Sequence, residues 1–243
     1  MTILEVENIS KHFGGLKALD RVSFDLEEGG MLGLIGPNGS GKTTMFNVIT
    51  GFLKPTSGSV TFCGQDITGY APYKACKAGI ARTFQLNRPF GNMTVLENVM
   101  VSLLNGQEPV KSLEQARADS EAILARTGLE EKRLAKAGTL SAVDQKRVEL
   151  ARALGARPKL LLLDEMMTGL NLREIEDAMK LIREVRNSGT TVIVVEHVMK
   201  AVLGLTDRVI VLSAGQKIFE GTPREVIHDK QVIEAYLGER EDA

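Results

Sequence analysis

Apolar and polar residues alternate along three short segments near the start of the chain. These segments are residues 2–9, 22–26 and 59–63. Alternation with a period of two residues is typical of a strand that buries one face and exposes the other. Because glycine-rich turns separate the segments, the pattern predicts an antiparallel sheet in this part of the chain.

Other segments are apolar without interruption. They lie at four places, residues 31–35, 160–163, 191–195 and 209–212. Uninterrupted apolar strands are typical of a parallel sheet whose two faces are both covered. Helices are predicted at residues 42–50 and 173–186, and strands that alternate with helices in this way indicate a parallel sheet.

The middle of the chain has no comparable strand pattern. There the apolar spacing predicts helices at residues 95–104, 112–127 and 144–154. In the last of them we expect four apolar residues to lie near one face: Val148, Leu150, Ala151 and Leu154. The chain is therefore expected to form one domain, residues 1–243, in which a helical part at 87–153 interrupts a core formed by 1–86 and 154–243.

The composition is that of an ordinary globular protein, with 43% hydrophobic and 25% charged residues among 243. The 30 basic and 31 acidic residues nearly cancel, so we expect no nucleic-acid partner, which usually requires a basic excess. Cys63 and Cys76 lack the spacing of a metal site and are expected to be free thiols. Since the sequence shows neither a signal-peptide pattern nor a membrane-spanning apolar run, work at a membrane would require a partner.

A glycine-rich segment follows the apolar residues 31–35 and precedes a predicted helix. It fits the pattern G-x-x-x-x-G-K-[ST] at Gly36, Pro37, Asn38, Gly39, Ser40, Gly41, Lys42 and Thr43. Glycines let the backbone wrap closely around a phosphate, and the helix start adds the positive end of its dipole. Lys42 supplies a charge for the β- and γ-phosphates and Thr43 a hydroxyl for Mg²⁺, and we expect Thr44 to contact the nucleotide too. The expected cofactors are ATP and Mg²⁺.

Two carboxylates follow the four leucines at residues 160–163. Asp164 and Glu165 therefore lie at the carboxyl end of a buried strand, where ligands bind in open parallel sheets. Asp164 is expected to hold the water shell of magnesium, and Glu165 to accept a proton from the attacking water or to orient it. The rival interpretation, a solvated acidic turn, is weakened by the phosphate loop.

Three further residues are candidates for the same site. His197 follows the apolar residues 191–195 and can donate to the γ-phosphate, with a structural capping role as the rival interpretation. Gln85 lies where the strand pattern gives way to the helical one, and it can ligate Mg²⁺ or position water. Phe13 can stack on adenine or be a buried core residue, and both interpretations stay open.

The order of these motifs resembles that of the ATP-binding subunits of ABC transporters. The matching positions are residues 36–43, Gln85, Leu140-Ser141, Asp164-Glu165, Gly169-Leu170-Asn171 and His197. The chain is most similar to importers of branched-chain amino acids and amides, on the basis of residues 13–19, 82–85, 88–90 and 93–99. The resemblance implies an α/β fold with a P-loop (RecA-like) parallel-sheet core, an N-terminal antiparallel β subdomain and an inserted α-helical subdomain.

The resemblance also implies partners and a mechanism. Two such subunits, identical or different, would hold ATP between the phosphate loop of one and the signature segment, with Ser141, of the other. Closure on ATP would move two integral membrane permease subunits, and hydrolysis would reopen the dimer. Residues 87–93 would contact a permease, and an external solute-binding protein would act indirectly. The chain would lie peripherally on the cytoplasmic face of the inner membrane.

The sequence departs from the family pattern in the signature. Where the family has Leu-Ser-Gly-Gly-Gln, this chain has Leu140-Ser141-Ala142-Val143-Asp144. Val143 adds bulk where a glycine lets the backbone approach phosphate, and Asp144 adds a negative charge, although at a helix start it is also a good cap. We expect the site that this segment completes to be weaker than one completed by the family sequence. Residues 166–168 and Asn171 also differ, which weakens the signal for communication across the dimer.

Alternatives to an importer subunit stay open from the sequence. An exporter subunit, such as one that extracts lipopolysaccharide, shares the motifs, and residues 82–85 and 93–99 favour import without deciding the direction. A soluble ABC protein of DNA repair or translation typically needs tandem domains or a long coiled coil. A soluble P-loop kinase would have no Ser141-type signature and would need an acceptor pocket. The transported solute is selected by other subunits, so this chain cannot name it.

Overall fold

The computed structural model describes residues 1–84 and 89–237 of the chain. Its first sheet is antiparallel and has the strand order β2-β1-β4-β5. The strands are β1 (Thr2–Phe13), β2 (Leu16–Glu27), β4 (Ser57–Phe62) and β5 (Gln65–Asp66). Val6 lies opposite both Phe24 and Val60, so that apolar side chains gather on one face. The predicted antiparallel sheet is confirmed, with longer strands than the alternating pattern alone indicated.

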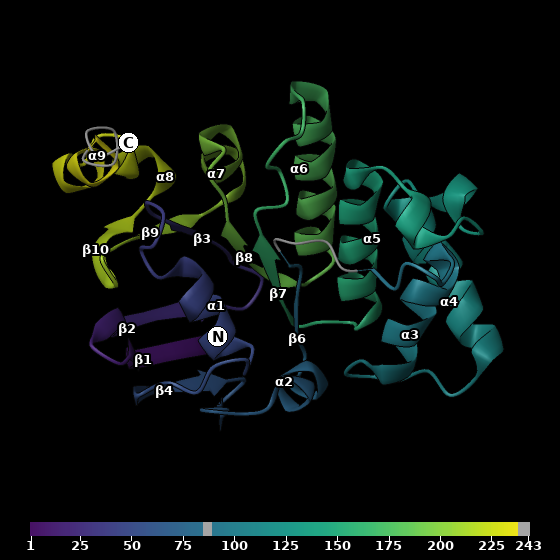
Figure 1. Ribbon diagram of the computed structural model, residues 1–243, viewed down its shortest axis with the longest axis horizontal. Helices are drawn as coiled ribbons and strands as arrows, with labels where there is room; N and C mark the ends of the chain where they lie inside the picture. The colour runs from purple at the N-terminus through teal and green to yellow at the C-terminus, as the bar shows by residue number, and fades with distance from the viewer. Residues whose placement is uncertain (85–88, 238–243) are drawn as a thin grey trace.

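The second sheet has six strands in the order β10-β9-β3-β8-β7-β6 (Figure 1). They are β3 (Met31–Ile35), β6 (Ile80–Arg82), β7 (Leu160–Asp164), β8 (Thr191–Val195), β9 (Arg208–Ser213) and β10 (Gln216–Gly221). Five of them run parallel, and β10 runs antiparallel to β9. The two sheets confirm the predicted α/β fold with a parallel-sheet core and an antiparallel β part.

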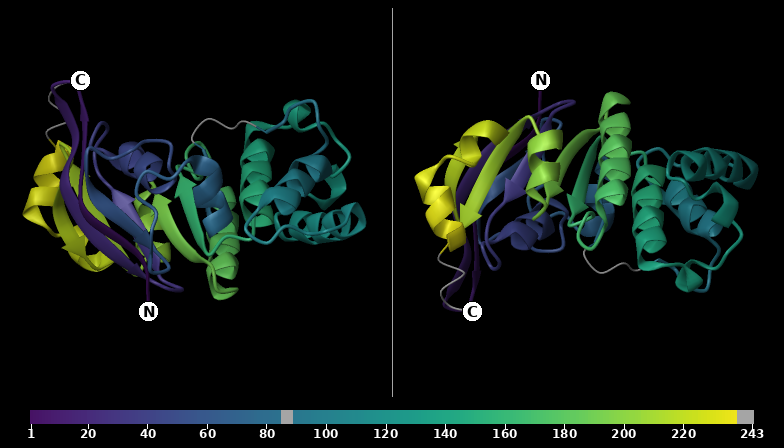
Figure 2. Two further views of the ribbon diagram at one scale, coloured as in Figure 1. Left: turned by 90° about the horizontal axis from the view of Figure 1, so that it is seen from below. Right: turned by 90° about the horizontal axis from the view of Figure 1, so that it is seen from above.

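The two faces of the parallel sheet enter different cores. Leu160 and Leu162 pack with the antiparallel sheet and with α1 (Lys42–Ile49), which lies between the two sheets. Leu161 and Leu163 point the other way, into a core with α6 (Leu172–Asn187) and α7 (Met199–Leu205). Figures 1 and 2 show these helices covering the sheet. Burial on both faces is the reason why these strands are apolar without interruption.

Three shorter helices complete this part of the molecule. α2 (Pro72–Ala78) precedes β6, and α8 (Pro223–Val226) and α9 (Lys230–Leu237) follow β10. Val226 and Val232 of the last two helices pack in a small core with Val209 and Val211 of β9.

A group of helices lies at one end of the molecule (Figure 2). It consists of α3 (Val95–Asn105), α4 (Leu113–Arg126) and α5 (Ala142–Gly155), with short 3-10 turns at Glu130–Lys132 and Ala137–Thr139. Val148 and Ala151 of α5 pack in the core of this group, whereas Leu150 packs on the other side, with the strands and α6. The expectation of one apolar face on α5 is therefore wrong. This helix has two buried faces because it joins the helical group to the parallel sheet.

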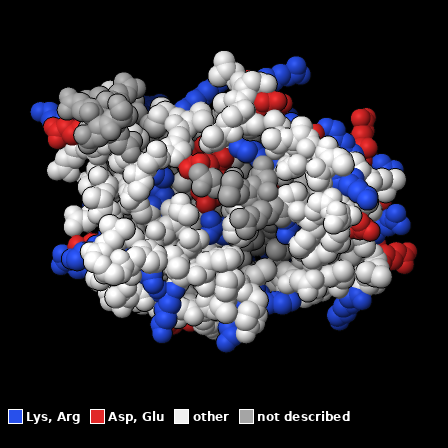
Figure 3. All heavy atoms as spheres, in the orientation of Figure 1, with Lys and Arg blue, Asp and Glu red and all other residues white. Residues whose placement is uncertain are grey.

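Charged side chains of both signs are interspersed over the visible, described surface in Figure 3. This distribution fits the formal net charge of −1. Among the helices of the described residues, none is long and apolar enough to cross a membrane.

Candidate functional site

The phosphate-loop motif lies between β3 and α1, at the carboxyl end of the parallel sheet. Two of its glycines are required by their surroundings. Gly36 has a φ of 147°, and a Cβ there would lie 2.0 Å from the carbonyl oxygen of Leu212. Gly41 has a φ of 107°, and a Cβ there would lie 2.7 Å from the carbonyl oxygen of Ala18. A larger residue at either position would displace the loop from its neighbours.

The side chain of Lys42 is buried inside this loop. Its Nζ donates hydrogen bonds to the carbonyl oxygens of Gly36 at 2.6 Å and Pro37 at 2.7 Å. Gly41 is the N-cap of α1 and has no side chain to cap it, so the first N–H groups of the helix are left for other acceptors. An ammonium group and the positive end of a helix dipole therefore converge on the loop, an arrangement that suits a chain of phosphates.

A cavity opens beside the loop. It is lined by Phe13, residues 16–18, residues 38–44, Glu165 and Ala214. The ring of Phe13 is 46% exposed, and the ammonium of Lys11 lies 5.1 Å from its centroid. The interpretation of Phe13 as a buried core residue is therefore wrong, and its ring is accessible to a flat ligand.

Asp164 is the last residue of β7, and its side chain is buried. Its Oδ2 accepts a hydrogen bond from Nη2 of Arg82 at 2.9 Å, and its N–H donates to Oγ1 of Thr83 at 3.0 Å. Burial raises the pKa of Asp164, and the charge of Arg82 opposes that rise. Burial likewise lowers the pKa of Arg82, and Asp164 opposes that change. The ion pair of Arg82 and Asp164 thus holds the Asp164 carboxylate at the end of β7.

Glu165 and His197 meet where the neighbouring strands β7 and β8 end. Oε1 of Glu165 lies 2.9 Å from Nε2 of His197, which is the donor because a carboxylate only accepts. Glu165 has a φ of 49°, in the left-handed region that is uncommon for a residue with a side chain. Its N–H donates to the carbonyl oxygen of Val195 at 2.9 Å, which holds this conformation. Glu165 lines the cavity beside the loop, so a carboxylate that contacts an imidazole lies next to the phosphate-loop motif.

This arrangement is shared with a known family. The sequence model of the family described as "ABC transporter" matches residues 19–168, which is more than half of the chain. The chain belongs to the ABC transporter family. It is an ABC ATPase, which binds nucleotide and hydrolyses ATP. A second model, described as "Branched-chain amino acid ATP-binding cassette transporter", matches residues 216–242.

Relatives match this ABC ATPase over nearly its whole length. One is the high-affinity branched-chain amino acid transport ATP-binding protein LivG of Salmonella typhimurium, 41% identical over 98% of both chains. The protein of the same description named BraF, from Pseudomonas aeruginosa, is 39% identical over the same shares. A solved ATP-binding cassette of an ABC transporter in its ADP conformation is 38% identical, with a TM-score of 0.88 over 98% of this chain and 99% of that one.

The oxygen donors of this ABC ATPase fit a magnesium ion. Thr43 contributes a hydroxyl from the first turn of α1 and Asp164 a carboxylate from the end of β7, and both are oxygen ligands of the kind that Mg²⁺ prefers. Magnesium usually takes one or two protein carboxylates and completes its shell with phosphates and water. Among the described residues, no group of three or more His, Cys, Asp or Glu could hold a metal ion. Gln85, the third predicted ligand, lies outside the described residues.

The signature residue Ser141 lies away from the phosphate loop of its own chain. It is the N-cap of α5 and is not among the residues that line the cavity beside the loop. Its Oγ donates to Oδ2 of Asp144 at 2.9 Å, and Nζ of Lys132 donates to the same oxygen at 2.5 Å. Burial favours a higher pKa for Asp144, but the hydrogen bonds from Lys132 and Ser141 outweigh it, and the pKa is lowered. The Asp144 charge is therefore balanced within the helical group. The cap of α5 is Ser141, whose Oγ accepts a hydrogen bond from the N–H of Asp144 at 3.2 Å, so the interpretation of Asp144 as the cap is wrong.

Lys146, on α5, forms hydrogen bonds with the backbone of Glu165 and of the segment that follows it. Its Nζ donates to the carbonyl oxygens of Glu165 at 3.3 Å, Met166 at 3.2 Å and Thr168 at 2.6 Å. The signature helix is thereby tied to the residue proposed to accept the proton. Sequence reasoning missed Lys146, because backbone carbonyls are the same at every position and leave no signal in the sequence.

Glu196 is the second site residue that the sequence analysis left without a role. Its side chain is 1% exposed, and its Oε1 accepts a hydrogen bond from the N–H of Met167 at 2.8 Å. Burial raises the pKa of Glu196, and the Met167 N–H and the charge of Lys146 oppose the rise. A glutamate directly after an apolar strand, next to His197, is the signal that could have found it.

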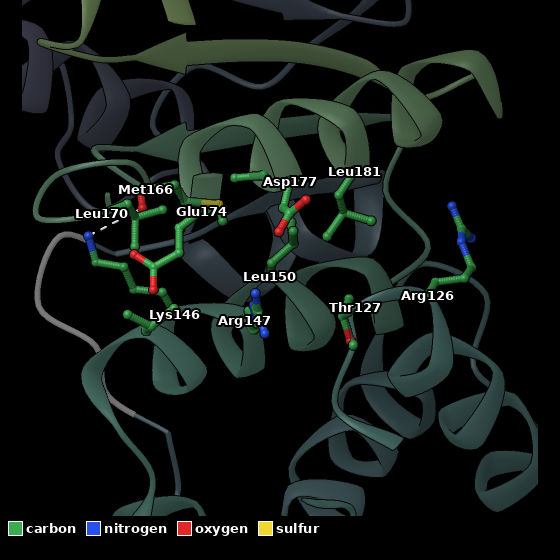
Figure 4. A pocket seen from close by; sticks show the side chains of 13 residues that line it. Arg126, Thr127, Lys146, Arg147, Leu150, Met166, Leu170, Glu174, Asp177 and Leu181 are labelled. Carbon is green, nitrogen blue, oxygen red and sulfur yellow. Dashed lines mark hydrogen bonds between the residues drawn. The ribbon is translucent and has the colours of Figure 1, made fainter. Parts of the chain in front are cut away.

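A second cavity of the ABC ATPase lies between α5 and α6 (Figure 4). Lys146 and Arg147 reach it from α5, and Glu174 and Asp177 from α6, with Leu150 on its apolar wall. It adjoins the segment after Glu165 but includes no residue of the phosphate loop.

Proposed function

We propose that this chain is the ATP-hydrolysing, energy-coupling subunit of an importer for branched-chain amino acids or related small solutes. The observation that carries the proposal is the match to relatives named for branched-chain amino acid transport, at 39% and 41% identity over 98% of both chains. The match of residues 216–242 supports the same solute class, because it lies outside the part that the general ABC description covers. An exporter subunit or a soluble kinase is not favoured by these relatives.

In this proposal the cavity beside the phosphate loop binds ATP. The exposed ring of Phe13 stacks on adenine, and residues 36–44 enclose the phosphates. The ammonium of Lys42 exchanges the carbonyl oxygens of its own loop for phosphate oxygens, which carry more negative charge. Thr43 and Asp164 hold magnesium, which when bound balances the charge of the phosphates. Gln85 is proposed as a further ligand.

Glu165 and His197 are proposed to carry the hydrolysis. The carboxylate of Glu165 accepts a proton from the attacking water. Its contact of 2.9 Å with His197 fixes the direction of that carboxylate, and the imidazole can donate to the γ-phosphate. Support for these roles comes from the position of both residues after the adjacent strands β7 and β8, and from Glu165 lining the cavity beside the phosphate loop.

We infer that the working form is a pair of ABC ATPases, identical or different. Because Ser141 lies away from its own loop, the Ser141 of one chain would complete the site of the other. A solved cassette that is 29% identical, with a TM-score of 0.84 over 91% of this chain and 99% of that one, is described as dimeric in a post-hydrolysis state with ADP and phosphate bound. The altered signature of this chain would then act on its partner's nucleotide.

Two integral membrane permease subunits are the proposed partners of this pair. Their contact would include residues 87–93, of which 87 and 88 lie outside the described residues. The ring of Phe90 lies against the guanidinium of Arg152, whose central carbon is 4.5 Å from the ring centroid. Arg152 in turn lines a surface groove beside β6. The chain would thus lie on the cytoplasmic face of the membrane, with a helical subdomain at residues 87–153, and an external solute-binding protein would act through the permeases.

Uptake by cells tests the proposal. In cells whose only copy of the gene encodes the Lys42→Ala variant, we expect uptake of labelled leucine, isoleucine and valine to fall to the level of a deletion. The matched control is Lys180→Ala, which removes an exposed lysine from α6 and should leave uptake unchanged. Undiminished uptake with Lys42→Ala would contradict the proposed function.

A further inference from the structure

The turn at residues 165–168, directly after β7, begins with the proposed proton acceptor. Within it, Met166 and Met167 are 6% and 1% exposed, so the polar backbone groups of the turn are largely shielded from water. Shielded N–H and C=O groups need partners inside the protein. Three carbonyls and one N–H of this turn find theirs in two side chains from elsewhere in the chain, Lys146 of α5 and Glu196, the residue after β8.

Lys146 holds the carbonyl groups of the turn. Its Nζ donates to the carbonyl oxygens of Glu165, Met166 and Thr168, and an ammonium has three N–H groups to donate. The side chain extends from α5 toward Met166 (Figure 4). Because three carbonyls share one cation, this side of the turn is fixed to α5 at a single point.

Glu196 holds the turn through an N–H group instead. Its Oε1 accepts from the N–H of Met167, whereas its Oε2 is buried and makes no hydrogen bond with any of the described residues. Such an oxygen costs free energy, and its presence calls for an explanation in its surroundings. A neutral amide would accept the Met167 N–H as well, so the explanation must lie in the negative charge.

The charge of Glu196 acts on Lys146. Burial raises the pKa of Glu196 and lowers the pKa of Lys146, and each of the two charges opposes the shift of the other. The carboxylate therefore helps to keep the ammonium charged beneath the turn, while the ammonium makes the buried carboxylate less costly. The two contacts to the turn thus support each other.

We propose that Lys146 and Glu196 are positioning residues for hydrolysis, which hold residues 165–168 and thereby set the direction of the Glu165 carboxylate. The proposal rests on the proposed function, because it takes Glu165 as the proton acceptor. Glu165 has a φ of 49°, and its backbone is held at both ends, by Val195 at the N–H and by Lys146 at the carbonyl. A misplacement of about 1 Å at a reacting group can slow a reaction about a hundredfold. Release of the turn would therefore slow hydrolysis although neither side chain touches the reacting atoms.

Steady-state ATP hydrolysis by the complete assembly, with its permeases and partner ATPase, tests the role of Lys146. Lys146→Met removes the ammonium but keeps an unbranched side chain that suits a helix, and we expect kcat to fall about tenfold or more. KM for ATP should stay within about twofold, because the phosphate loop is unchanged. Lys146→Arg, which can still donate to carbonyl oxygens, should retain most of the activity. Lys180→Met, at an exposed lysine of α6, is the control and should change neither quantity.

Two further measurements exclude a merely structural effect of Lys146→Met. Each rate is divided by the number of sites that bind a non-hydrolysable fluorescent ATP analogue, so that partial unfolding alone produces no loss. In the Glu165→Gln background, Lys146→Met should slow single-turnover hydrolysis by less than about twofold, because the carboxylate whose direction it sets is already gone.

Two substitutions of Glu196 test the other side of the turn. Glu196→Ala removes the acceptor of the Met167 N–H together with the charge, and we expect kcat to fall about tenfold with KM for ATP unchanged. Glu196→Gln removes the charge but keeps an oxygen that accepts the same bond, so its kcat should lie between those of Glu196→Ala and the unmodified chain. Glu184→Ala, at an exposed glutamate of α6, is the control.

The outcomes separate the proposed base from its positioning residues. If Glu165→Gln hydrolyses ATP at the unmodified rate, the proposed base itself is wrong. If Glu165→Gln is slow but Lys146→Met is as fast as its control, Lys146 does not position the base. If the losses of Lys146→Met and Glu165→Gln multiply, Lys146 acts on something other than Glu165, and the inference is overturned. Should Glu196→Ala fail to fold, an undiminished kcat of Glu196→Gln shows that the charge of Glu196 has no positioning role.

Discussion

Glu165 combines a strained backbone with the side chain that is proposed to accept the proton. A residue with a Cβ in the left-handed region costs about 1 kcal/mol, so its surroundings must hold it there. The N–H of Glu165 is fixed by the carbonyl oxygen of Val195, and its carbonyl oxygen by the ammonium of Lys146. These contacts hold the backbone of Glu165, and its carboxylate contacts Nε2 of His197 at 2.9 Å.

Replacing Glu165 by glutamine tests its role. Glu165→Gln keeps the shape of the side chain but removes the proton acceptor, so we expect hydrolysis to slow by about a hundredfold or more, while ATP still binds. Steady-state phosphate release and binding of a fluorescent ATP analogue measure the two quantities. The control is Glu184→Gln, at an exposed residue of α6. If Glu165→Gln and its control hydrolysed ATP equally fast, Glu165 would not be the base.

Glu196 predicts a pH dependence of stability. Because burial raises its pKa above the ordinary value of 4.5, the folded chain holds this proton more tightly than the unfolded chain. The contribution of Glu196 to the free energy of unfolding is therefore fully present below about pH 4.5 and decreases as the pH rises through the raised pKa. At pH values above the raised pKa, this contribution to the free energy of unfolding is fully lost and no longer changes with pH.

Urea denaturation of Glu196→Gln at pH 5 and pH 8 measures this effect. The amide oxygen of glutamine can still accept from the N–H of Met167, but the residue no longer ionises. We expect the variant to gain stability relative to the unmodified chain as the pH rises from 5 to 8. A difference in the free energy of unfolding that is the same at both pH values would show that Glu196 does not titrate in this range.

The site residues that could be predicted from the sequence have reactive or charged side chains, and they lie at positions that the sequence pattern identifies. Lys42, Asp164, Glu165 and His197 follow buried strands, and the carboxyl ends of parallel strands meet at one edge. The structure brings these four together. Arg82 entered only through the family resemblance of residues 82–85 and received no role in the site, because its partners lie far away in the sequence, on α1 and at the end of β7.

The N-terminus of α6 shows how the local sequence determines where a helix begins. Asn171 caps α6: its Oδ1 accepts from the N–H of Glu174 at 3.0 Å, and Oε2 of Glu174 accepts from the N–H of Asn171 at 2.8 Å. This reciprocal arrangement satisfies two N–H groups that the helix itself leaves unpaired. The family usually has aspartate at this position, and either residue caps a helix well.

The capping role of Asn171 predicts opposite results for two substitutions. Asn171→Ala should lower the free energy of unfolding by about 1 kcal/mol, because the cap is lost. Asn171→Asp should keep stability close to that of the unmodified chain, since a carboxylate oxygen accepts the same bonds. Chemical denaturation measures both. Equal losses in the two variants would mean that the cap does not stabilise α6.

Elements with a clear apolar pattern were predictable, and short or half-exposed ones were not. Residues 31–35 and 191–195 coincide with β3 and β8, because burial on both faces makes these strands wholly apolar. β6 has three residues, too few to show a period. β10 is partly exposed along its whole length and therefore lacks an apolar signal. The two faces of α5 were missed because its apolar residues serve two cores.

At the scale of the whole molecule, the signature and the phosphate loop belong to different parts of the fold. Ser141 begins α5 in the helical group, whereas Lys42 begins α1 between the two sheets. A complete site of the kind that the family resemblance implies therefore requires a second subunit. In the proposed pair, we expect the altered signature of one chain to weaken the site that it completes on the other chain.

Restoring the family signature tests this property. Val143→Gly together with Asp144→Gln removes the bulk of Val143 and frees the Ser141 hydroxyl, which now donates to Asp144. We expect a faster ATPase in the assembled transporter and a free energy of unfolding that is about 1 kcal/mol lower, because the bond from Lys132 is lost. Glu130→Gln, at an exposed residue near the same helix, is the control. An unchanged or slower ATPase would show that the variant signature does not weaken a site.

Transport by the complete assembly tests most directly whether hydrolysis by this chain drives import. The assembly is purified with its permeases and partner ATPase, reconstituted in lipid vesicles, and supplied with ATP and with binding protein carrying labelled leucine. With the unmodified chain we expect leucine to cross the membrane in proportion to the ATP hydrolysed. With Glu165→Gln we expect both processes to slow by about a hundredfold or more, although ATP remains bound. Leucine transport that continues at the normal rate with Glu165→Gln would contradict a driving role for this chain.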